Sequence, residues 1–376
     1  AGGGTPNLNR TLRSNLRPYT KHEPLMTMTP AYAIRSNASW LKTTCCATFL
    51  AAALTGCGGG ATVPPSAVDV AHGRVIRWEA FPSQHVDARD IDIWVPDGVF
   101  SADERQDGFG GGDSGPEGGT DSVKVLFMHD GQMLFDSTST WNGQEWGVDE
   151  SVGGLIEEGR LGPVIVVAIP NNGGKRYAEY FPEGVLERMG PVERERVIGR
   201  MEGGRALGDA YVRFLAEELL PEVERQFPVL PGAENRVVMG SSMGGLISLY
   251  AALERPDVFG RVGAVSTHWP MVSEELLERT APENPYFDAM LSYLDERIPH
   301  ASAGSHVFYY DYGTETLDSL YAPYQKQVDQ LMLGKGYSLR NWRSLMFPGA
   351  AHDEASWAER LRLPLQVLAG PDRYRY

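Results

Sequence analysis

The stretch RVVMGSSMGGLISLYAALERP, residues 236–256, decides the fold. It begins with a short apolar, β-branched run typical of a buried strand and ends with residues that favour a helix. Between them stands the pattern Gly-x-Ser-x-Gly, with Ser242 at its centre and Gly240 and Gly244 on either side. A nucleophilic serine that leaves its strand through a very tight turn needs this context, because larger neighbours would collide. We therefore predict that Ser242 is a nucleophile and that Ser241 is only its neighbour.

Around this stretch, strand candidates alternate with helix candidates. The central strand candidates, such as KVLFMHD (124–130) and PVIVVAIP (163–170), are continuous apolar runs, typical of parallel strands covered on both faces. No helix separates the first two candidates, RVIRWEAF (74–81) and DIDIWVP (90–96), so we expect an antiparallel pair there. The pattern predicts a single α/β domain over residues 74–376, with a mostly parallel sheet of about eight strands and helices on both faces.

Composition and charge exclude several classes of protein. With 376 residues the chain is long enough to bury one large core. Its net charge of −15 would repel phosphate backbones, and no Lys/Arg cluster offsets it, so we expect no nucleic-acid partner. The glycines around Ser242 lack the Lys-Ser/Thr of a P-loop, and no G-x-G-x-x-G follows the first parallel strand.

The region before the domain carries the signs of export. Residues 1–57 are interpreted as a non-native leader followed by a signal peptide, because charged residues precede an apolar run too short to span a bilayer. The run ends in Leu-Thr-Gly-Cys, which resembles the lipobox of bacterial lipoproteins. We expect an exported bacterial protein that is anchored to the cell envelope by a lipid on Cys57, or else secreted after cleavage. Residues 58–73 are expected to form a flexible tether and residues 101–121 a disordered loop.

A serine nucleophile needs a base and an acid, which should follow it in the order serine, acid, histidine. His352 follows the last strand candidate on a loop that opens a helix, which favours it as the base. His268 also follows a strand and is the competitor, with lining the pocket as its expected role. The acid should lie on the loop after HVFYYDYG, where Glu315 and Asp318 both qualify and the residues alone leave the choice open.

Several motifs together resemble a known family. HDGQMLFD, EWGVDE, RYAEYFP and HDEASWAERL, with the serine and histidine, are similar to the putative esterase group of α/β-hydrolases, which includes enterochelin esterase-like, feruloyl esterase-like and S-formylglutathione hydrolase-like enzymes. The resemblance covers roughly residues 74–370. It implies ester hydrolysis or acyl transfer without metal or cofactor. Ser242 and His352 match the nucleophile and base, and Asp318, which precedes Ser-Leu-Tyr, matches the acid better than Glu315.

The reaction also needs donors for the oxyanion. We expect the backbone N–H of Met243, directly after the nucleophile, to be one of them. The second is expected from the loop after KVLFMHD, where Gln132 offers its N–H and Gly131 lets the backbone approach the substrate.

Candidates for substrate binding come from three places. The segment after the strand PVIVVAIP predicts rim residues, although two of them, Arg176 and Glu179, are equally expected to pair only with each other. Residues 184–208 carry many charges and are read either as a helical cap over the pocket or as a solvated insertion. The complete set of candidates is Arg176, Glu179, Tyr180, His268 and Trp269, with Trp141 and Trp146 as further aromatic candidates that core packing explains equally well.

These features favour a serine esterase that acts on a small-molecule ester and contacts a membrane only through the lipid on Cys57. One alternative is an acyltransferase that uses the same three residues. Another is a non-catalytic surface lipoprotein that binds carbohydrate or a siderophore.

Overall fold

The computed structural model describes residues 68–99, 122–273 and 283–371. The predicted leader, the signal peptide, Cys57 and the predicted disordered loop lie outside these ranges. Within them, no helix is long and apolar enough to cross a membrane.

A single eight-stranded sheet runs through the described domain, in the order β1-β2-β4-β3-β5-β6-β7-β8. The strands from β4 and β3 through β8 pair in parallel, whereas β1 pairs antiparallel with β2, and β2 with β4. This arrangement confirms the predicted fold class. The strands are β1 (Arg74–Phe81), β2 (Arg89–Val95), β3 (Lys124–His129), β4 (Val164–Ile169), β5 (Arg236–Ser241), β6 (Arg261–Val265), β7 (Val307–Gly313) and β8 (Trp342–Phe347).

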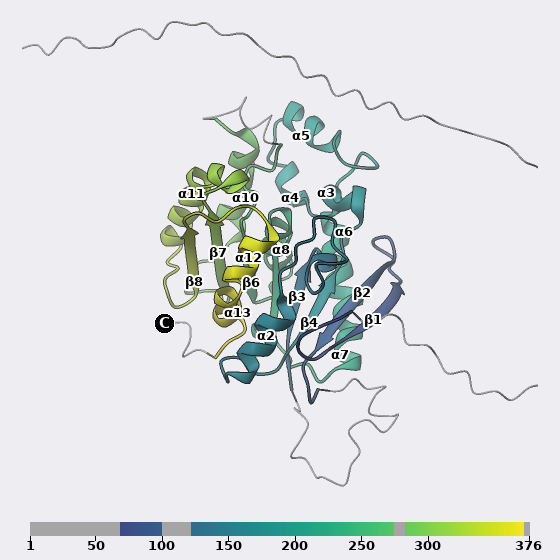
Figure 1. Ribbon diagram of the computed structural model, residues 1–376. Helices are drawn as coiled ribbons and strands as arrows, with labels where there is room; N and C mark the ends of the chain where they lie inside the picture. Colours follow the sequence, from purple (N-terminus) through teal and green to yellow (C-terminus); the bar gives the residue numbers. More distant parts are fainter. Residues whose placement is uncertain (1–67, 100–121, 274–282, 372–376) are drawn as a thin grey trace, which may run out of the picture. The chain divides into compact units, whose positions relative to one another are not determined.

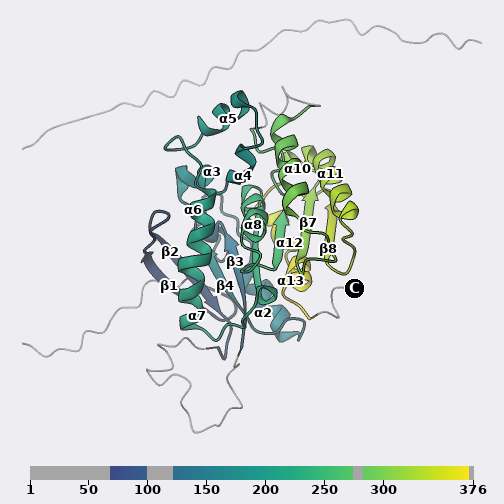
Figure 2. The same cartoon turned by 180° about the vertical axis from the view of Figure 1, so that it is seen from behind.

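The alternation of side chains along each strand builds two cores, one on each face of the sheet. In β3, Val125 and Phe127 belong to the core under α6, α7 and α8, while Leu126 and Met128 belong to the core under α2, α12 and α13. The two views in Figures 1 and 2 show these helix groups in front of opposite faces. The helices are α2 (Val148–Glu157), α3 (Arg176–Glu179), α4 (Glu183–Leu186), α5 (Pro191–Ile198), α6 (Gly208–Arg213), α7 (Leu220–Gln226), α8 (Met243–Glu254), α10 (Pro285–Arg297), α11 (Ala322–Gly334), α12 (Glu354–Arg360) and α13 (Arg362–Leu368), with a π-helical turn over Phe214–Leu219.

The end of the predicted tether, residues 68–73, contacts the domain. The N–H of Ala71 donates to Asp149 Oδ2 at 2.7 Å, and the carbonyl of His72 accepts from the indole of Trp94 at 2.7 Å. The side chain of His72 lies so close to Gly153 that a Cβ added to this glycine would be 2.4 Å from the Cβ of His72 and 2.5 Å from its ring. These residues are therefore packed against the domain, and the rest of the predicted tether lies outside the described residues.

Residues 184–208 form α4, α5 and the turns beside them, at the upper end of the domain in Figure 1. Val185 and Val197 are buried in the larger core, and Arg200 lies over the ring of Tyr177 at 5.4 Å. The segment is thus packed on the domain, and none of its residues lines the cavity described below.

Candidate active site

Ser242 stands at the turn between β5 and α8 with φ 56° and ψ −121°. A non-glycine residue with this backbone conformation costs on the order of 1–3 kcal/mol, so the surrounding structure must hold it. Two hydrogen bonds do so: the N–H of Ser242 donates to the carbonyl of Val265 at 3.0 Å, and its carbonyl accepts from His268 N–H at 3.1 Å. The side chain consequently projects from a strained turn at the carboxyl edge of the sheet.

The two glycines of the motif are not equivalent, which corrects the expectation that both are sterically required. A Cβ on Gly240 would lie 2.9 Å from the carbonyl carbon of Gly244, whereas a Cβ on Gly244 would meet nothing closer than Asp130 Oδ2 at 3.4 Å. The first distance is a backbone collision and the second an ordinary contact. Only Gly240 is required for the turn to close against the helix.

Substitution of these glycines should therefore give opposite results. We expect Gly240→Ala to lower the free energy of unfolding by about 1–3 kcal/mol, as overpacking does. Gly244→Ala should leave it unchanged or raise it by up to about 1 kcal/mol, because alanine favours the first turn of a helix. Urea unfolding of both variants measures the difference, and equal destabilisation would contradict the steric argument.

His352 and Asp318 meet on the loops after β8 and β7. Asp318 is fully buried in a short 3₁₀ turn, and its Oδ1 lies 2.6 Å from His352 Nδ1. Glu315, the alternative acid, is exposed at the start of the same turn, and its carboxylate takes no hydrogen bond from the described residues. The structure thus brings Asp318, and not Glu315, to the histidine.

Two aromatic rings fix the orientation of the His352 imidazole. Tyr321 and Trp357 stand edge-on to it, with ring centroids 5.7 Å and 5.1 Å away and interplanar angles of 85° and 82°. Because Nδ1 is held by Asp318, Nε2 is the nitrogen available for a proton transfer.

A cavity of about 470 Å³ contains both Ser242 and His352. Trp141 at its rim is 83% exposed, whereas Trp146 is buried and packs on Trp357 with ring centroids 5.2 Å apart. The cavity is lined by Asp130, Gln132, Met133, Trp141, Asn142, Trp146, Asn171, Arg176, Ser241, Ser242, His352, Asp353, Glu354 and Trp357.

The two predicted oxyanion donors lie just after the neighbouring strands β5 and β3. Met243 is the first residue of α8 and Gln132 follows β3, and no described residue accepts a hydrogen bond from either backbone N–H. Gly131 serves a different purpose from the one expected. A Cβ there would lie 2.5 Å from the backbone nitrogen of Ile169, so glycine is required for packing against β4 and not for approach to a substrate.

Arg176 lines the cavity but is held by a partner that sequence reasoning missed. Its Nε and Nη2 donate to the two oxygens of Asp130, each at 2.7 Å, and Asn171 Nδ2 donates to Asp130 Oδ1 at 2.7 Å. Burial alone would raise the pKa of Asp130, but the Arg176 guanidinium and these hydrogen bonds outweigh it and lower the pKa. Asp130 has φ 56°, and this ion pair holds it directly before the turn that carries Gln132.

The predicted pairing of Arg176 with Glu179, and a place for Glu179 and Tyr180 at the rim, are wrong. Glu179 is fully buried, where Arg89 donates to its two oxygens at 2.6 and 2.9 Å. Tyr180 is also fully buried, and its hydroxyl accepts the backbone N–H of Asp130 at 3.1 Å. Tyr180 thus holds the backbone of Asp130 from inside the domain, and Glu179 belongs to a buried ion pair with Arg89.

His268 and Trp269 do not line the described cavity either. Both ring nitrogens of His268 are occupied, Nδ1 by the Tyr321 hydroxyl at 2.7 Å and Nε2 by the carbonyl of Val272 at 2.9 Å. Trp269 is 1% exposed and donates from its indole to Gln325 at 2.8 Å, so it belongs to the core.

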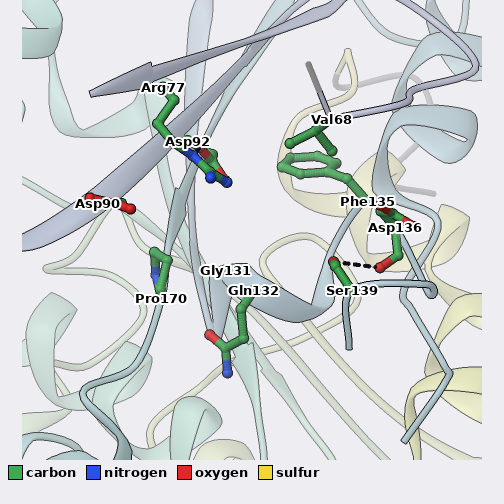
Figure 3. A pocket seen from close by; sticks show the side chains of 10 residues that line it. All are labelled: Val68, Arg77, Asp90, Asp92, Gly131, Gln132, Phe135, Asp136, Ser139 and Pro170. Atoms are coloured by element: carbon green, nitrogen blue, oxygen red, sulfur yellow. Dashed lines mark hydrogen bonds and ion pairs between the residues drawn. The ribbon is translucent and has the colours of Figure 1, made fainter. Parts of the chain in front are cut away.

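A second cavity, of about 360 Å³, is lined by Gln132 as well (Figure 3). On one wall Arg77 makes two 2.7 Å hydrogen bonds to Asp92, so the charges of these two side chains are paired. Phe135 and Val68 stand on the opposite wall.

Within the described ranges, no group of three His, Cys, Asp or Glu side chains is arranged to hold a metal.

His129, the last residue of β3, gives the fold a predictable response to pH. It is 2% exposed, its ring lies near those of Tyr180 and Tyr211, and its Nδ1 is 2.9 Å from the Tyr211 hydroxyl. Burial lowers the pKa of His129 to about 3. Below about pH 6.5, where an unfolded histidine takes up a proton, the unfolded chain therefore binds a proton that the folded chain does not. The neutral, buried His129 therefore makes its full contribution to the free energy of unfolding above about pH 6.5, and this contribution is lost as the pH falls below that value.

The variant His129→Asn keeps a hydrogen-bonding group near the Nδ1 position but does not titrate. Between pH 7 and pH 5 we expect it to lose about 2 kcal/mol less unfolding free energy than the parent. Burial raises the pKa of Asp149 to about 7, so its effect on the pH dependence of stability is opposite to that of His129. This effect is the same in the parent and in the variant. The measurement is urea unfolding at the two pH values, and parallel losses would contradict the assignment to His129.

The chain is similar in sequence to one family model and to proteins of Bacillus subtilis (strain 168). The chain matches the family model described as "Putative esterase" over residues 116–361. In Bacillus subtilis (strain 168), the uncharacterized protein YbbA is 24% identical over 157 residues, which are 41% of this chain and 54% of YbbA. Ferri-bacillibactin esterase BesA of the same organism is 34% identical over 77 residues, 20% of this chain and 26% of BesA. The matched segments thus span about half or less of these relatives.

Solved structures with a similar fold include two esterases. The enterobactin esterase FES from Shigella flexneri, crystallised with 2,3-di-hydroxy-N-benzoyl-glycine, has a TM-score of 0.51 and 18% identity, covering 79% of this chain and 59% of that one. The ferulic acid esterase AmCE1/Fae1A from Anaeromyces mucronatus, in complex with ferulic acid, has a TM-score of 0.50 and 19% identity, covering 80% and 92%.

Proposed function

The chain belongs to the Putative esterase family, and we propose that it is a serine esterase that cleaves a carboxylic ester through an acyl-enzyme. Ser242 is the nucleophile, His352 the general base and Asp318 the acid. The observation that carries this proposal is the 2.6 Å hydrogen bond between His352 and buried Asp318, beside a cavity that His352 and Ser242 line together.

The reaction has two halves, and in each of them His352 first accepts a proton and then donates it. Ser242 Oγ attacks the ester carbonyl while His352 Nε2 takes its proton, and the tetrahedral intermediate forms. The bond from the carbonyl carbon to the alkoxy oxygen then breaks, and the alcohol leaves with the proton from Nε2. Water repeats the sequence on the acyl-enzyme, which releases the acid and restores Ser242. Asp318 holds the proton on Nδ1, so that Nε2 accepts.

The oxyanion is stabilised by the backbone N–H groups of Met243 and Gln132. Neither donor has an acceptor among the described residues, and Met243 also lies at the N-terminus of α8, where the helix dipole favours negative charge. The Asp130–Arg176 ion pair supports the second donor by holding the turn before it.

The cavity suits a small-molecule ester that carries a flat ring. Trp141, Trp146 and Trp357 supply its aromatic surface, and the one arginine in its lining, Arg176, is engaged by Asp130. FES was crystallised with 2,3-di-hydroxy-N-benzoyl-glycine and AmCE1/Fae1A with ferulic acid, so catecholate and feruloyl esters are the first substrates to compare.

The proposal is tested with an ester panel that contains acetylated sugars, feruloyl esters, catecholate siderophores, S-formylglutathione and short p-nitrophenyl esters. Each is assayed with and without an acceptor alcohol. Free acid as the only acyl product supports hydrolysis, whereas a new ester in the presence of the acceptor supports acyl transfer at the same site. A folded protein that cleaves nothing and resists a fluorophosphonate probe would favour the non-catalytic binder.

A further inference from the structure

Ser266 lies directly after β6, on neither of the loops that carry His352 and Asp318. It is fully buried and has φ 41°, a conformation that L-residues with side chains rarely adopt. Its backbone is held by β7, because its N–H donates to the carbonyl of Asp311 at 2.9 Å. A strained, buried polar residue beside a reactive site calls for a functional explanation.

The hydroxyl of Ser266 contacts the proposed catalytic acid. Its Oγ lies 2.5 Å from Asp318 Oδ2, which also accepts the backbone N–H of Gly313 at 2.6 Å. The other oxygen, Oδ1, faces His352 Nδ1. The carboxylate is therefore oriented by two donors on one oxygen, and the second oxygen is left for the histidine.

The direction of the Ser266 proton follows from its other neighbours. Oγ accepts from Trp357 Nε1 at 3.0 Å and from Arg360 Nη2 at 2.8 Å. Indole and guanidinium nitrogens only donate, so both lone pairs of Oγ are used and its single proton is available for Asp318. A hydroxyl that rotates freely in solution is fixed here in one direction.

Both of these donors stand on α12, the helix that begins directly after the His352 loop. Arg360 Nη2 also reaches Asp311 Oδ1 at 3.1 Å, so this cation is shared between β7 and the serine. Ser266 consequently contacts β7 through its backbone N–H, and its hydroxyl joins Asp318 to α12.

We propose that Ser266 is a positioning residue that holds the Asp318 carboxylate in the orientation from which it aligns His352. The proposal rests on the proposed function, because it assigns Asp318 the role of the acid. Ser266 contacts no substrate, so its loss should lower kcat and leave KM unchanged.

The test measures kcat and KM of the full chain on a p-nitrophenyl ester for Ser266→Ala and Ser266→Gly. Glycine adopts φ 41° without strain, so the second variant removes the hydroxyl and eases the backbone. For both we expect kcat to fall about 10–100-fold with KM within about 2-fold. Ser248→Ala is the matched control, since Ser248 is also fully buried and its hydroxyl bonds to the carbonyl of Gly244 at 2.7 Å, away from Asp318. Its kcat should stay within about 2-fold of the parent.

A double-mutant cycle separates positioning from general loss of structure. In an Asp318→Asn background, Ser266→Gly should lower kcat no further, because the carboxylate through which it acts is gone. A kcat within 2-fold of the parent for both single variants overturns the inference, as does the same loss with and without Asp318. If Asp318→Asn itself has no effect, the proposed acid is wrong, and that result is distinct from a failure confined to Ser266.

Discussion

Ser242→Ala is expected to lower kcat/KM for a p-nitrophenyl ester by about 10⁴–10⁶-fold, because without the hydroxyl no acyl-enzyme forms. What remains should be the activity that the oxyanion donors and binding provide for attack by water. The strained turn is held by backbone hydrogen bonds and by Gly240, so the change should leave the fold intact. Kinetics on the purified variant, with urea unfolding as a check, measure this.

Ser241→Ala is the informative comparison, since the two serines are adjacent and both line the cavity. A fluorophosphonate probe should label the parent and Ser241→Ala but not Ser242→Ala. Labelling that disappears with Ser241 and persists without Ser242 would move the nucleophile by one residue and remove the basis of the proposed mechanism.

The fold was predictable because its signals are local. Continuous apolar runs around 124–130 and 163–170 predicted buried parallel strands, and the glycine–serine turn predicted where a side chain would leave the sheet. Each inference needed only a few neighbouring residues. His352 was predicted from the order of the strands, because it follows the last strand of the predicted sheet.

The pairings of charged residues were not predictable in this way. Arg176 bonds to Asp130 and Glu179 to Arg89, so each partner lies tens of residues away in sequence and no periodicity connects them. In the sequence the nearest opposite charge to Arg176 is three positions on, which suggested the wrong pair. The pairing of Arg176 depends on tertiary structure, because Asp130 at the end of β3 lies against the start of α3.

Some of the network behind the acid could have been noticed. Trp357 and Arg360 are three residues apart on α12, a spacing that places both on one helix face directly after His352. That pattern indicates a face turned toward the site. Ser266 offered no comparable signal, because a serine after a strand is common and its strained backbone is visible only in three dimensions.

Substitution of Asp318 is expected to have the second large effect on kcat, and it tests whether Asp318 or Glu315 is the acid. Asp318→Asn should lower kcat about 10⁴-fold, by the tautomer argument that applies to histidine held by an acid. Ser266 and Gly313 both donate to the Oδ2 position, so they should attract the amide oxygen and turn the NH₂ group toward His352. His352 would then accept at Nδ1 and carry its proton on Nε2, where it cannot take the proton of Ser242.

Glu315→Gln makes the same chemical change three residues away and should keep kcat within about 2-fold, since Glu315 is exposed and lies outside the cavity lining. Steady-state kinetics on both variants decide between the two carboxylates. A large loss for Glu315→Gln with an active Asp318→Asn would mean that the loop rearranges during catalysis and that the 2.6 Å contact is not the working one. Because Asp318 is fully buried among donors, its substitution should also lower stability, so the comparison is made at a temperature where urea unfolding shows both variants folded.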